Sequence, residues 1–180
     1  FIPSPEWKKQ TKNESWWDGD TYNFSIGQSD LQVTPLQVAV AYSAIANGGI
    51  LYKPQIVNKI IDSPVVQTTG LSRIIQEFKP EIINQNFIDA ENLQIVREGM
   101  RDGVLYGSSV FLNSLPVNIA AKTGTAETSR NGYYDAWISS FTPYENPEIV
   151  LVTTIEDVQG LGSTTLSISK EILKWYFSQK

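Results

Sequence analysis

The sequence contains no cysteine and no histidine. Without cysteine, the chain has no disulfide, no thiolate nucleophile and no thiolate metal site. Without histidine, the serine–histidine–aspartate relay and imidazole acid–base catalysis are excluded. A hydrolase or acyltransferase built from these residues therefore needs lysine, glutamate, aspartate or tyrosine as its base. We expect neither a metal ion nor another cofactor.

Positive charge and long apolar runs are also scarce. The chain has 14 basic and 19 acidic residues and a net charge of −5, which argues against nucleic acid as the main partner because phosphate binding needs a basic surface. The longest apolar stretch, residues 38–46, is far shorter than the roughly 20 residues that span a membrane. Because the chain starts at Phe1, we expect it to be processed or to be part of a longer protein, with any anchor upstream.

The remaining composition is sufficient for one folded domain. Of the 180 residues, 41% are hydrophobic and 11% are aromatic, which is enough to bury a core. We treat residues 1–180 as a single domain in three parts. The first part, residues 1–33, is expected to be an irregular segment; the second, 34–115, is mainly helical; the third, 116–180, holds the sheet strands and a C-terminal helix.

The irregular segment is predicted from its composition. Residues 1–33 are polar and rich in proline, glycine, asparagine and aspartate, which favour turns and loops. Three tryptophans interrupt it, at Trp7, Trp16 and Trp17. Because large aromatic side chains usually serve as packing anchors, we expect them to attach the segment to a neighbouring surface.

A first helix is predicted between Thr34 and Asn47. Thr34 and Gln37 fit a capping box, Pro35 suits the first helical position, and Asn47 with the following glycine gives a stop. Since nearly every position between them is apolar or small, we expect a helix buried on all sides. Residues 50–61 then resemble one short strand or two, interrupted at Pro54.

A second helix is predicted to begin after Asp89. Leu93, Val96 and Met100 fall at helical spacing and predict one apolar face. A third helix is predicted over residues 163–179, folded back on the sheet. Its expected buried side consists of Ile168, Ile172, Leu173, Tyr176 and Phe177.

The last third of the chain predicts a sheet. Strand-like residues occupy 118–127, 136–141 and 148–155, with turn signals between them, which indicates an antiparallel meander. The run "IVLV" at 149–152 lacks alternation, as expected of a central strand covered on both faces. The predicted class is α/β of the α+β type, with an antiparallel sheet flanked by helices.

The stretch Lys122-Thr123-Gly124-Thr125 carries the most specific chemistry, on a strand expected near the edge of the sheet. Gly124 has no Cβ, so a ligand backbone can lie against the strand. Lys122 offers a positive charge, and the threonines offer hydroxyl groups. This set suits an extended ligand that ends in a carboxylate. An ordinary exposed lysine beside a strand glycine explains the short motif equally well.

The surrounding sequence favours the first interpretation. The segments "WWDGDTYNFSIGQ", "VTPLQVAVAYSAIANGG", "AAKTGTAE" and "NPEIVLVTTIE" follow one another in this order. With them the chain resembles the C-terminal half of the transpeptidase domain of class B penicillin-binding proteins, most of all the elongation-type penicillin-binding protein 2 group. The resemblance includes the Lys-Thr-Gly signature of this superfamily. It implies a β-lactamase/transpeptidase-like fold that is incomplete in this chain.

The resemblance also implies roles for the motif. Lys122 corresponds to the lysine that supports proton transfer and orients active-site hydroxyls. Thr123 and Thr125 correspond to the hydroxyls that hold the terminal carboxylate of a D-Ala-D-Ala stem peptide of peptidoglycan or of a β-lactam. The backbone N–H of Thr125 corresponds to half of an oxyanion hole, and Gly124 permits close approach.

The nucleophile that the resemblance implies is missing from this chain. It should be the serine of a Ser-x-x-Lys sequence far upstream of Lys122, with a Ser-x-Asn loop between the two. The sequence 167–170 matches the first pattern and 129–131 the second, but 167–170 lies downstream and 129–131 falls in a predicted turn. Ser108 and Ser109 have no lysine three residues later. Short patterns of this kind arise by chance, so we expect the nucleophile upstream of this chain.

Three functional hypotheses follow. The leading one is part of a membrane-anchored serine D,D-transpeptidase on the extracytoplasmic side, with this chain inactive alone. The second is a non-catalytic module that keeps the transpeptidase-like sheet for binding. A β-lactamase or β-lactam sensor is less favoured, because those families lack the block from Gly27-Gln28 to Gln37. In each case we expect the missing part of the domain, or a second copy, to cover an open apolar face.

Overall fold

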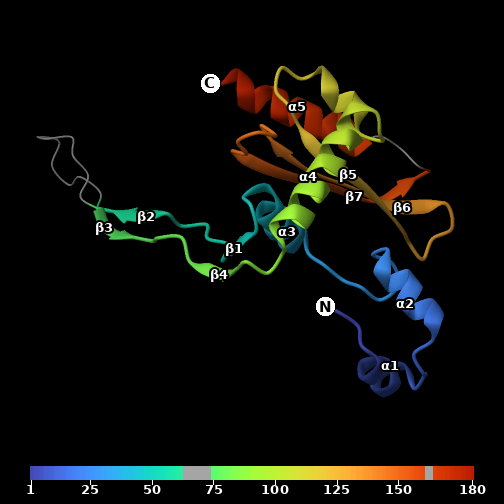
Figure 1. The fold of residues 1–180 in the computed structure, drawn as a ribbon. Helices are drawn as coiled ribbons and strands as arrows, with labels where there is room; N and C mark the ends of the chain where they lie inside the picture. The colour runs from blue at the N-terminus through green and yellow to red at the C-terminus, as the bar shows by residue number, and fades with distance from the viewer. Residues whose placement is uncertain (63–73, 161–163) are drawn as a thin grey trace, which may run out of the picture.

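The structure, a computed structural model, describes residues 1–62, 74–160 and 164–180. Its helices are α1 (Pro5–Lys12), α2 (Asp18–Ser25), α3 (Pro35–Ala46), α4 (Ala90–Leu105), the short 3-10 helix η1 (Val110–Ser114) and α5 (Thr164–Ser178). Its strands are β1 (Ile50–Tyr52), β2 (Lys59–Ile61), β3 (Ile74–Glu77), β4 (Ile82–Gln85), β5 (Ala120–Glu127), β6 (Tyr133–Thr142) and β7 (Ile149–Gln159). The α+β class with antiparallel sheets is therefore confirmed (Figure 1).

The main sheet is the predicted antiparallel meander, in the order β5-β6-β7. Strand β5, with the Lys-Thr-Gly motif, is an edge strand, as expected. The run "IVLV" belongs to β7, which is the other edge of the described sheet, so its expected central position is wrong. The expected coverage of both faces is confirmed, because α3 and α5 both contact β7.

Two apolar clusters lie on opposite faces of the sheet. Ala121 packs with Leu166 and Leu173 of α5 in one cluster, whereas Ala120 packs with Ala46 of α3 in the other. Neighbouring residues of a strand point to opposite faces, so α3 and α5 enclose the sheet between them. Helix α4 contributes to both clusters and lies along the β5 edge.

Helix α3 begins as predicted. The Thr34 hydroxyl accepts the Gln37 N–H at 3.2 Å, and the Gln37 side chain accepts the Thr34 N–H at 2.9 Å. The helix is not buried on all sides, however. Leu36 is 58% exposed and borders an open hollow with Leu51 and Pro54. The described part of the chain places no element over this side, and the apolar residues of α3 are left uncovered there.

The segment 1–33 differs from the irregular structure expected, because it contains helices α1 and α2. The turn-forming residues act here as helix caps. The Ser4 side chain accepts the Trp7 N–H at 3.2 Å ahead of Pro5, and Asp20 accepts the Trp17 N–H at 2.7 Å. These caps stabilise helix starts that composition alone identified as loops.

The tryptophans of this segment make local contacts. The Trp7 ring lies 4.9 Å from that of Phe1, and the Trp16 N–H donates to Thr21 at 2.8 Å. Trp17 is 67% exposed. The expectation that all three attach the segment to a neighbouring surface is therefore not met in this chain: the contacts of Trp7 and Trp16 lie within residues 1–33, and Trp17 faces solvent.

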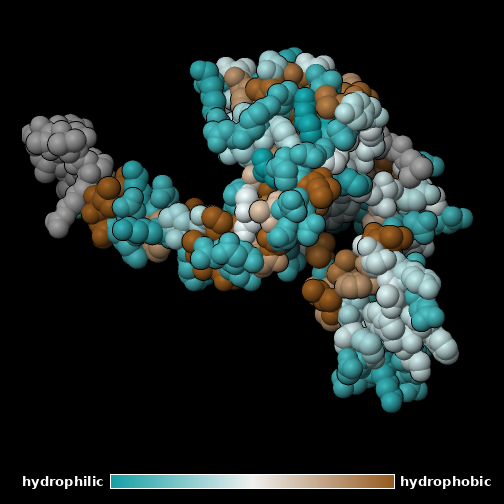
Figure 2. Space-filling view, in the orientation of Figure 1, coloured by the Kyte–Doolittle hydropathy of each residue, from teal (hydrophilic) through white to brown (hydrophobic). Residues whose placement is uncertain are grey.

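The part 34–115 is less helical than expected, since it also contains β1 to β4. Strands β1 and β4 pair, β2 and β3 pair, and Pro54 separates β1 from β2 as predicted. These two-stranded ribbons form an arm that extends away from the main sheet (Figure 1). Isoleucines favour strands, and they also give the arm an apolar surface, which Figure 2 shows in brown.

Helices α4 and α5 bury slightly different faces from those predicted. In α4, Leu93 and Met100 are buried, but Val96 is 46% exposed and the half-buried Arg97 lies on the packed side instead. In α5, Leu173 is buried, Tyr176 and Phe177 are half-buried, and Ile168 and Ile172 are exposed; Thr165, Leu166 and Ser169 take the inner positions. The Ser169 hydroxyl bonds to that of Thr153 at 2.8 Å, which compensates for its burial. The expected helix start at Ser163 lies outside the described residues.

In residues 1–62, 74–160 and 164–180, no helix combines the length and apolarity needed to cross a bilayer.

Candidate active site

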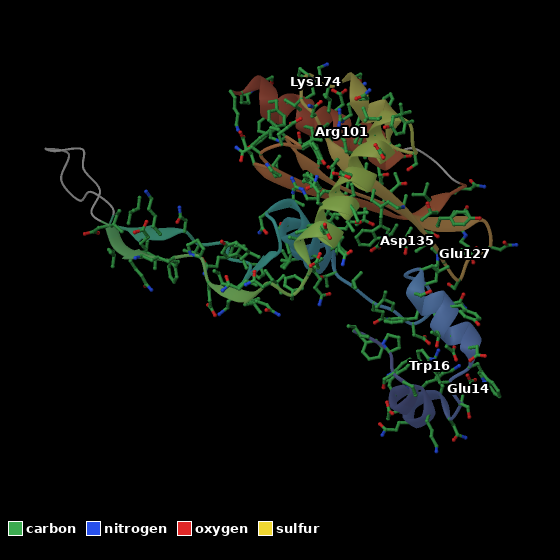
Figure 3. The ribbon with its side chains drawn as sticks, viewed as in Figure 1. Glu14, Trp16, Arg101, Glu127, Asp135 and Lys174 are labelled. Carbon is green, nitrogen blue, oxygen red and sulfur yellow. The ribbon has the colours of Figure 1, made fainter. Side chains whose placement is uncertain are left out.

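The Lys-Thr-Gly-Thr motif lies on the outer edge of β5, whose carbonyl groups accept side-chain donors. The outward carbonyl of Ile119 accepts Arg101 Nη1 at 2.9 Å, where α4 covers the strand. Figure 3 shows Arg101 on this helix beside the sheet. Further along, the Thr123 carbonyl accepts Lys122 Nζ at 2.6 Å and the Thr125 carbonyl accepts Gln28 Nε2 at 3.3 Å. The backbone carbonyls of Ile119, Thr123 and Thr125 therefore point away from β6.

The same geometry places two backbone donors on the open edge. In an antiparallel strand the N–H and C=O of one residue point to the same side. Because the carbonyls of Thr123 and Thr125 face outward, their N–H groups also face outward. The carbonyls already accept side-chain donors from the chain itself, so the N–H groups are what this edge offers to an incoming oxygen atom.

A cavity of about 290 Å³ adjoins this edge. Its walls come from the connection between α2 and α3, from α3, and from β5 and β6; they are Ile26, Gly27, Gln28, Leu31, Val33, Val38, Tyr42, residues 122–126, Trp137 and Ser139. The mixture of apolar walls with a few polar groups is typical of ligand sites. The four residues of the Lys-Thr-Gly-Thr motif all line it.

Lys122 lies on the α3 face of the sheet, paired with Ser139 of β6. Its side chain is exposed and lines the cavity, and its ammonium group donates to the Thr123 carbonyl at the strand edge. Tyr42 of α3 lines the same space. Burial raises the pKa of Tyr42 above its ordinary value, and the hydrogen bond with Ser139 partly opposes this shift. Tyr42 is therefore a neutral hydroxyl at physiological pH.

Gly124 lies opposite Trp137, also on the α3 face. A Cβ placed on Gly124 would lie 3.3 Å from the Trp137 Cβ, which is tighter than an ordinary contact. Glycine therefore keeps the strand close to its partner and leaves the motif without a side chain at its centre. The predicted role of Gly124 in close approach is compatible with this geometry.

Thr123 and Thr125 present their side chains to the other face of the sheet, since strand residues alternate. An extended ligand along the edge would thus meet Lys122 on one face and two hydroxyl groups on the other. The Thr123 hydroxyl lies 2.7 Å from the Ser108 hydroxyl, in the turn after α4. Figure 3 places Glu127 and Asp135 at the hairpin end of β5 and β6, near α2.

Sequence reasoning identified the motif and missed several of its neighbours. Gln28 was noted only within a family block, and its bond to Thr125 spans 97 residues of sequence. Tyr42 carries no signal in the sequence, and the only role that the sequence suggests for Ser108 is that of a nucleophile. No local pattern signals these contacts, because they arise from the packing of α3 and α4 on the sheet.

The short serine patterns do not form a second site. In the sequence 167–170, Ser169 is buried against Thr153, and Lys170 Nζ lies 4.1 Å from the centre of the Phe111 ring. These residues belong to α5, on the face of the sheet opposite the cavity. The sequence 129–131 lies in the turn between β5 and β6.

Comparison with known proteins identifies the family of this chain. The penicillin binding protein transpeptidase domain model matches residues 2–177. Penicillin-binding protein 2A of Bacillus subtilis is 31% identical over 183 aligned positions, which cover 94% of this chain and 25% of that protein. Peptidoglycan D,D-transpeptidase MrdA of Haemophilus influenzae is 26% identical, with 99% of this chain and 29% of that protein covered.

A solved structure gives the same result. Penicillin-binding protein PBP2 from Helicobacter pylori matches with a TM-score of 0.74 and 26% identity, over 99% of this chain and 30% of that chain. The chain thus spans less than a third of the length of these relatives. By sequence and by fold, it belongs to the family of penicillin-binding protein transpeptidase domains.

Proposed function

We propose that this chain is the carboxylate-binding part of a peptidoglycan D,D-transpeptidase, which cross-links D-Ala-D-Ala stem peptides and is acylated by β-lactams. The observation that carries the proposal is the open edge of β5. There Lys122, two threonine hydroxyls and two outward N–H groups surround the path of an extended ligand. Cationic and hydroxyl donors around backbone N–H groups suit a ligand that ends in a carboxylate.

Each motif residue has a role in this proposal. Lys122 holds the positive charge near the reacting groups and takes part in proton transfer. Thr123 and Thr125 bind the terminal carboxylate, and the Thr125 N–H stabilises the oxyanion that forms during acyl transfer. Gly124 leaves space for the ligand backbone.

The proposed nucleophile is a serine outside these 180 residues. Two observations support this placement: the relatives are more than three times as long as the matched region, and the Ser-x-x-Lys sequence of α5 is on the wrong face of the sheet. Without the serine no acyl-enzyme forms. The intact protein would be anchored in the membrane upstream, with this domain on the extracytoplasmic side.

Labelling with a fluorescent penicillin tests the proposal. In the full-length protein that contains these residues, we expect a covalent adduct that survives denaturing electrophoresis. Lys122→Ala should reduce the labelling rate by at least about 100-fold, as expected when one member of a catalytic unit is removed. Lys174→Ala is the matched control, since Lys174 is an exposed lysine on α5 (Figure 3), and it should label like the wild type.

The absence of a serine nucleophile from the sequence also favours a second candidate, a non-catalytic binding module. The two are separated by labelling the 180-residue chain and the full-length protein side by side. Labelled full-length protein and unlabelled short chain support the transpeptidase. An adduct on the short chain alone would show that our account of the nucleophile is wrong, and no adduct on either would favour the binding module.

The exposed apolar side chains of α3 and α5 support a covering partner. Leu36, Ile168, Ile172 and Trp175 are all exposed in this chain, and soluble monomers rarely leave large apolar patches open. We expect the missing part of the domain, or a second copy of the chain, to cover them. Light scattering of the purified 180-residue chain that shows a monodisperse monomer would contradict this expectation.

A further inference from the structure

Ser108 is a side-chain neighbour of the motif that the proposed roles do not use. Its hydroxyl lies 2.7 Å from the hydroxyl of Thr123, within the normal range for an O–H···O bond. Ser108 itself is exposed, so it is not a core residue whose burial explains its contact. The bond connects the turn after α4 directly to the edge strand.

The backbone around this turn is closely packed: the end of α4 lies against β5, and the turn lies against α4. A Cβ on Gly103 would lie 2.9 Å from the Ala121 carbonyl oxygen, and a Cβ on Gly107 would lie 2.8 Å from the Gly103 Cα. The Ser109 N–H also donates to the Gly103 carbonyl at 2.9 Å. Ser108 thus lies on closely packed backbone that brings its hydroxyl beside that of Thr123.

The direction of the hydrogen bond decides what Thr123 can do. A hydroxyl has one proton to donate and two lone pairs to accept. If Thr123 donated to Ser108, it would have no proton left for a carboxylate. When Ser108 donates instead, the Thr123 oxygen accepts that proton and its own hydrogen remains available for an anionic oxygen, where a charge-assisted bond is stronger.

We propose that Ser108 is a positioning residue for ligand binding, which orients the Thr123 hydroxyl so that it donates to the terminal carboxylate. This inference rests on the proposed function, because it assigns a helper to the proposed carboxylate site. Ser108 does not touch the reacting atoms; it acts through Thr123. It therefore affects the non-covalent capture of the ligand and leaves the later bond-forming step unchanged.

The test measures acylation of the full-length protein by a fluorescent penicillin over a range of concentrations. Such data separate the dissociation constant of the non-covalent complex from the first-order acylation rate. We expect Ser108→Ala to raise the dissociation constant by about two- to tenfold, the range for loss of one neutral hydrogen bond, with an unchanged acylation rate. Ser108→Thr should restore the wild-type value. Ser167→Ala, an exposed serine on α5, is the control and should change neither.

A double-mutant cycle then shows whether Ser108 acts through Thr123. In a Thr123→Val background, Ser108→Ala should have no further effect. An equal effect in both backgrounds, an unchanged dissociation constant in Ser108→Ala, or a loss confined to the acylation rate would each overturn the inference while leaving the proposed function intact. A wild-type protein that takes up no penicillin would instead refute the proposed function, and the role of Ser108 with it.

Discussion

Two glycines of helix α4 provide a matched pair for testing how tightly this helix is packed against the edge strand. Gly99 and Gly103 are one helical turn apart. A Cβ on Gly99 meets no atom within 4 Å in the described part of the chain, apart from chain neighbours and its own helix backbone. A Cβ on Gly103 would lie 2.9 Å from the carbonyl oxygen of Ala121, a distance that real Cβ atoms essentially never show.

The expected magnitudes follow from two opposing effects. Replacing glycine by alanine in a helix stabilises it by roughly 0.5–1 kcal/mol, because alanine loses less backbone entropy on folding. This gain is common to both sites. At Gly103 the added methyl group must push against the β5 backbone, and overpacking of this kind costs about 1–3 kcal/mol. The Gly99→Ala variant should therefore be more stable than the wild type. The free energy of unfolding of the Gly103→Ala variant should be lower than that of Gly99→Ala by about 1–3 kcal/mol.

Urea unfolding of both variants, followed by circular dichroism, measures this difference directly. For a chain of this size, each kcal/mol corresponds to about 2–4 °C in melting temperature, so thermal unfolding gives a second estimate. Equal stabilisation of the two variants would refute the reasoning, because it would mean that α4 moves away from β5 at no cost. Such freedom would also remove the close packing on which the role of Ser108 depends.

Three further predictions concern other parts of the fold. Thr34→Ala removes the cap of α3 and should cost roughly 1 kcal/mol in urea unfolding, whereas Thr34→Ser should cost little. Arg97→Lys loses the planar fork that donates to the carbonyls of Ile45, Ala46 and Tyr144 and should cost about 1–3 kcal/mol by the same assay; wild-type stability would show that water replaces these bonds. The hydrogen bond from Lys8 lowers the pKa of Asp20 below its ordinary 3.8. The ionised Asp20 therefore stabilises the folded state above that pH, and this contribution is lost as the pH falls below it. Tryptophan fluorescence during acid titration should therefore change at a higher pH in Asp20→Asn than in the wild type, and identical curves would contradict the prediction.

The starts of α3 and α4 and the strand order of the main sheet could be predicted because local chemistry decides them. The caps at Thr34 and Asp89 satisfy backbone N–H groups within three residues, and both helices begin where these residues predict. The meander also follows from local turns between neighbouring strands. For the same reason the edge position of β5, and with it the exposure of the Lys-Thr-Gly-Thr motif, could be predicted from order along the chain.

The failures have a common physical origin in contacts between distant parts of the sequence. Which side of α5 is buried depends on the sheet beneath it, and there Ser169 finds a hydroxyl partner while Ile168 does not pack inward. The α3 helix was expected to be buried, but burial requires a covering element, and the described chain has none on that side. Helices α1 and α2 were missed because the same residue types favour both loops and helix caps.

The polarity of the β5 edge follows from how its carbonyl groups are engaged. An exposed edge strand normally offers alternating donors and acceptors, which makes it a template for any other strand. Here Arg101, Lys122 and Gln28 each donate to an outward carbonyl, at Ile119, Thr123 and Thr125. The N–H groups of a second strand would meet carbonyls that already accept side-chain donors. The acceptor oxygens of a ligand, in contrast, would still find the N–H groups of Thr123 and Thr125. The edge is therefore biased against strand addition by another protein and towards oxygen-rich ligands, and a terminal carboxylate with an adjacent reactive carbonyl satisfies that requirement.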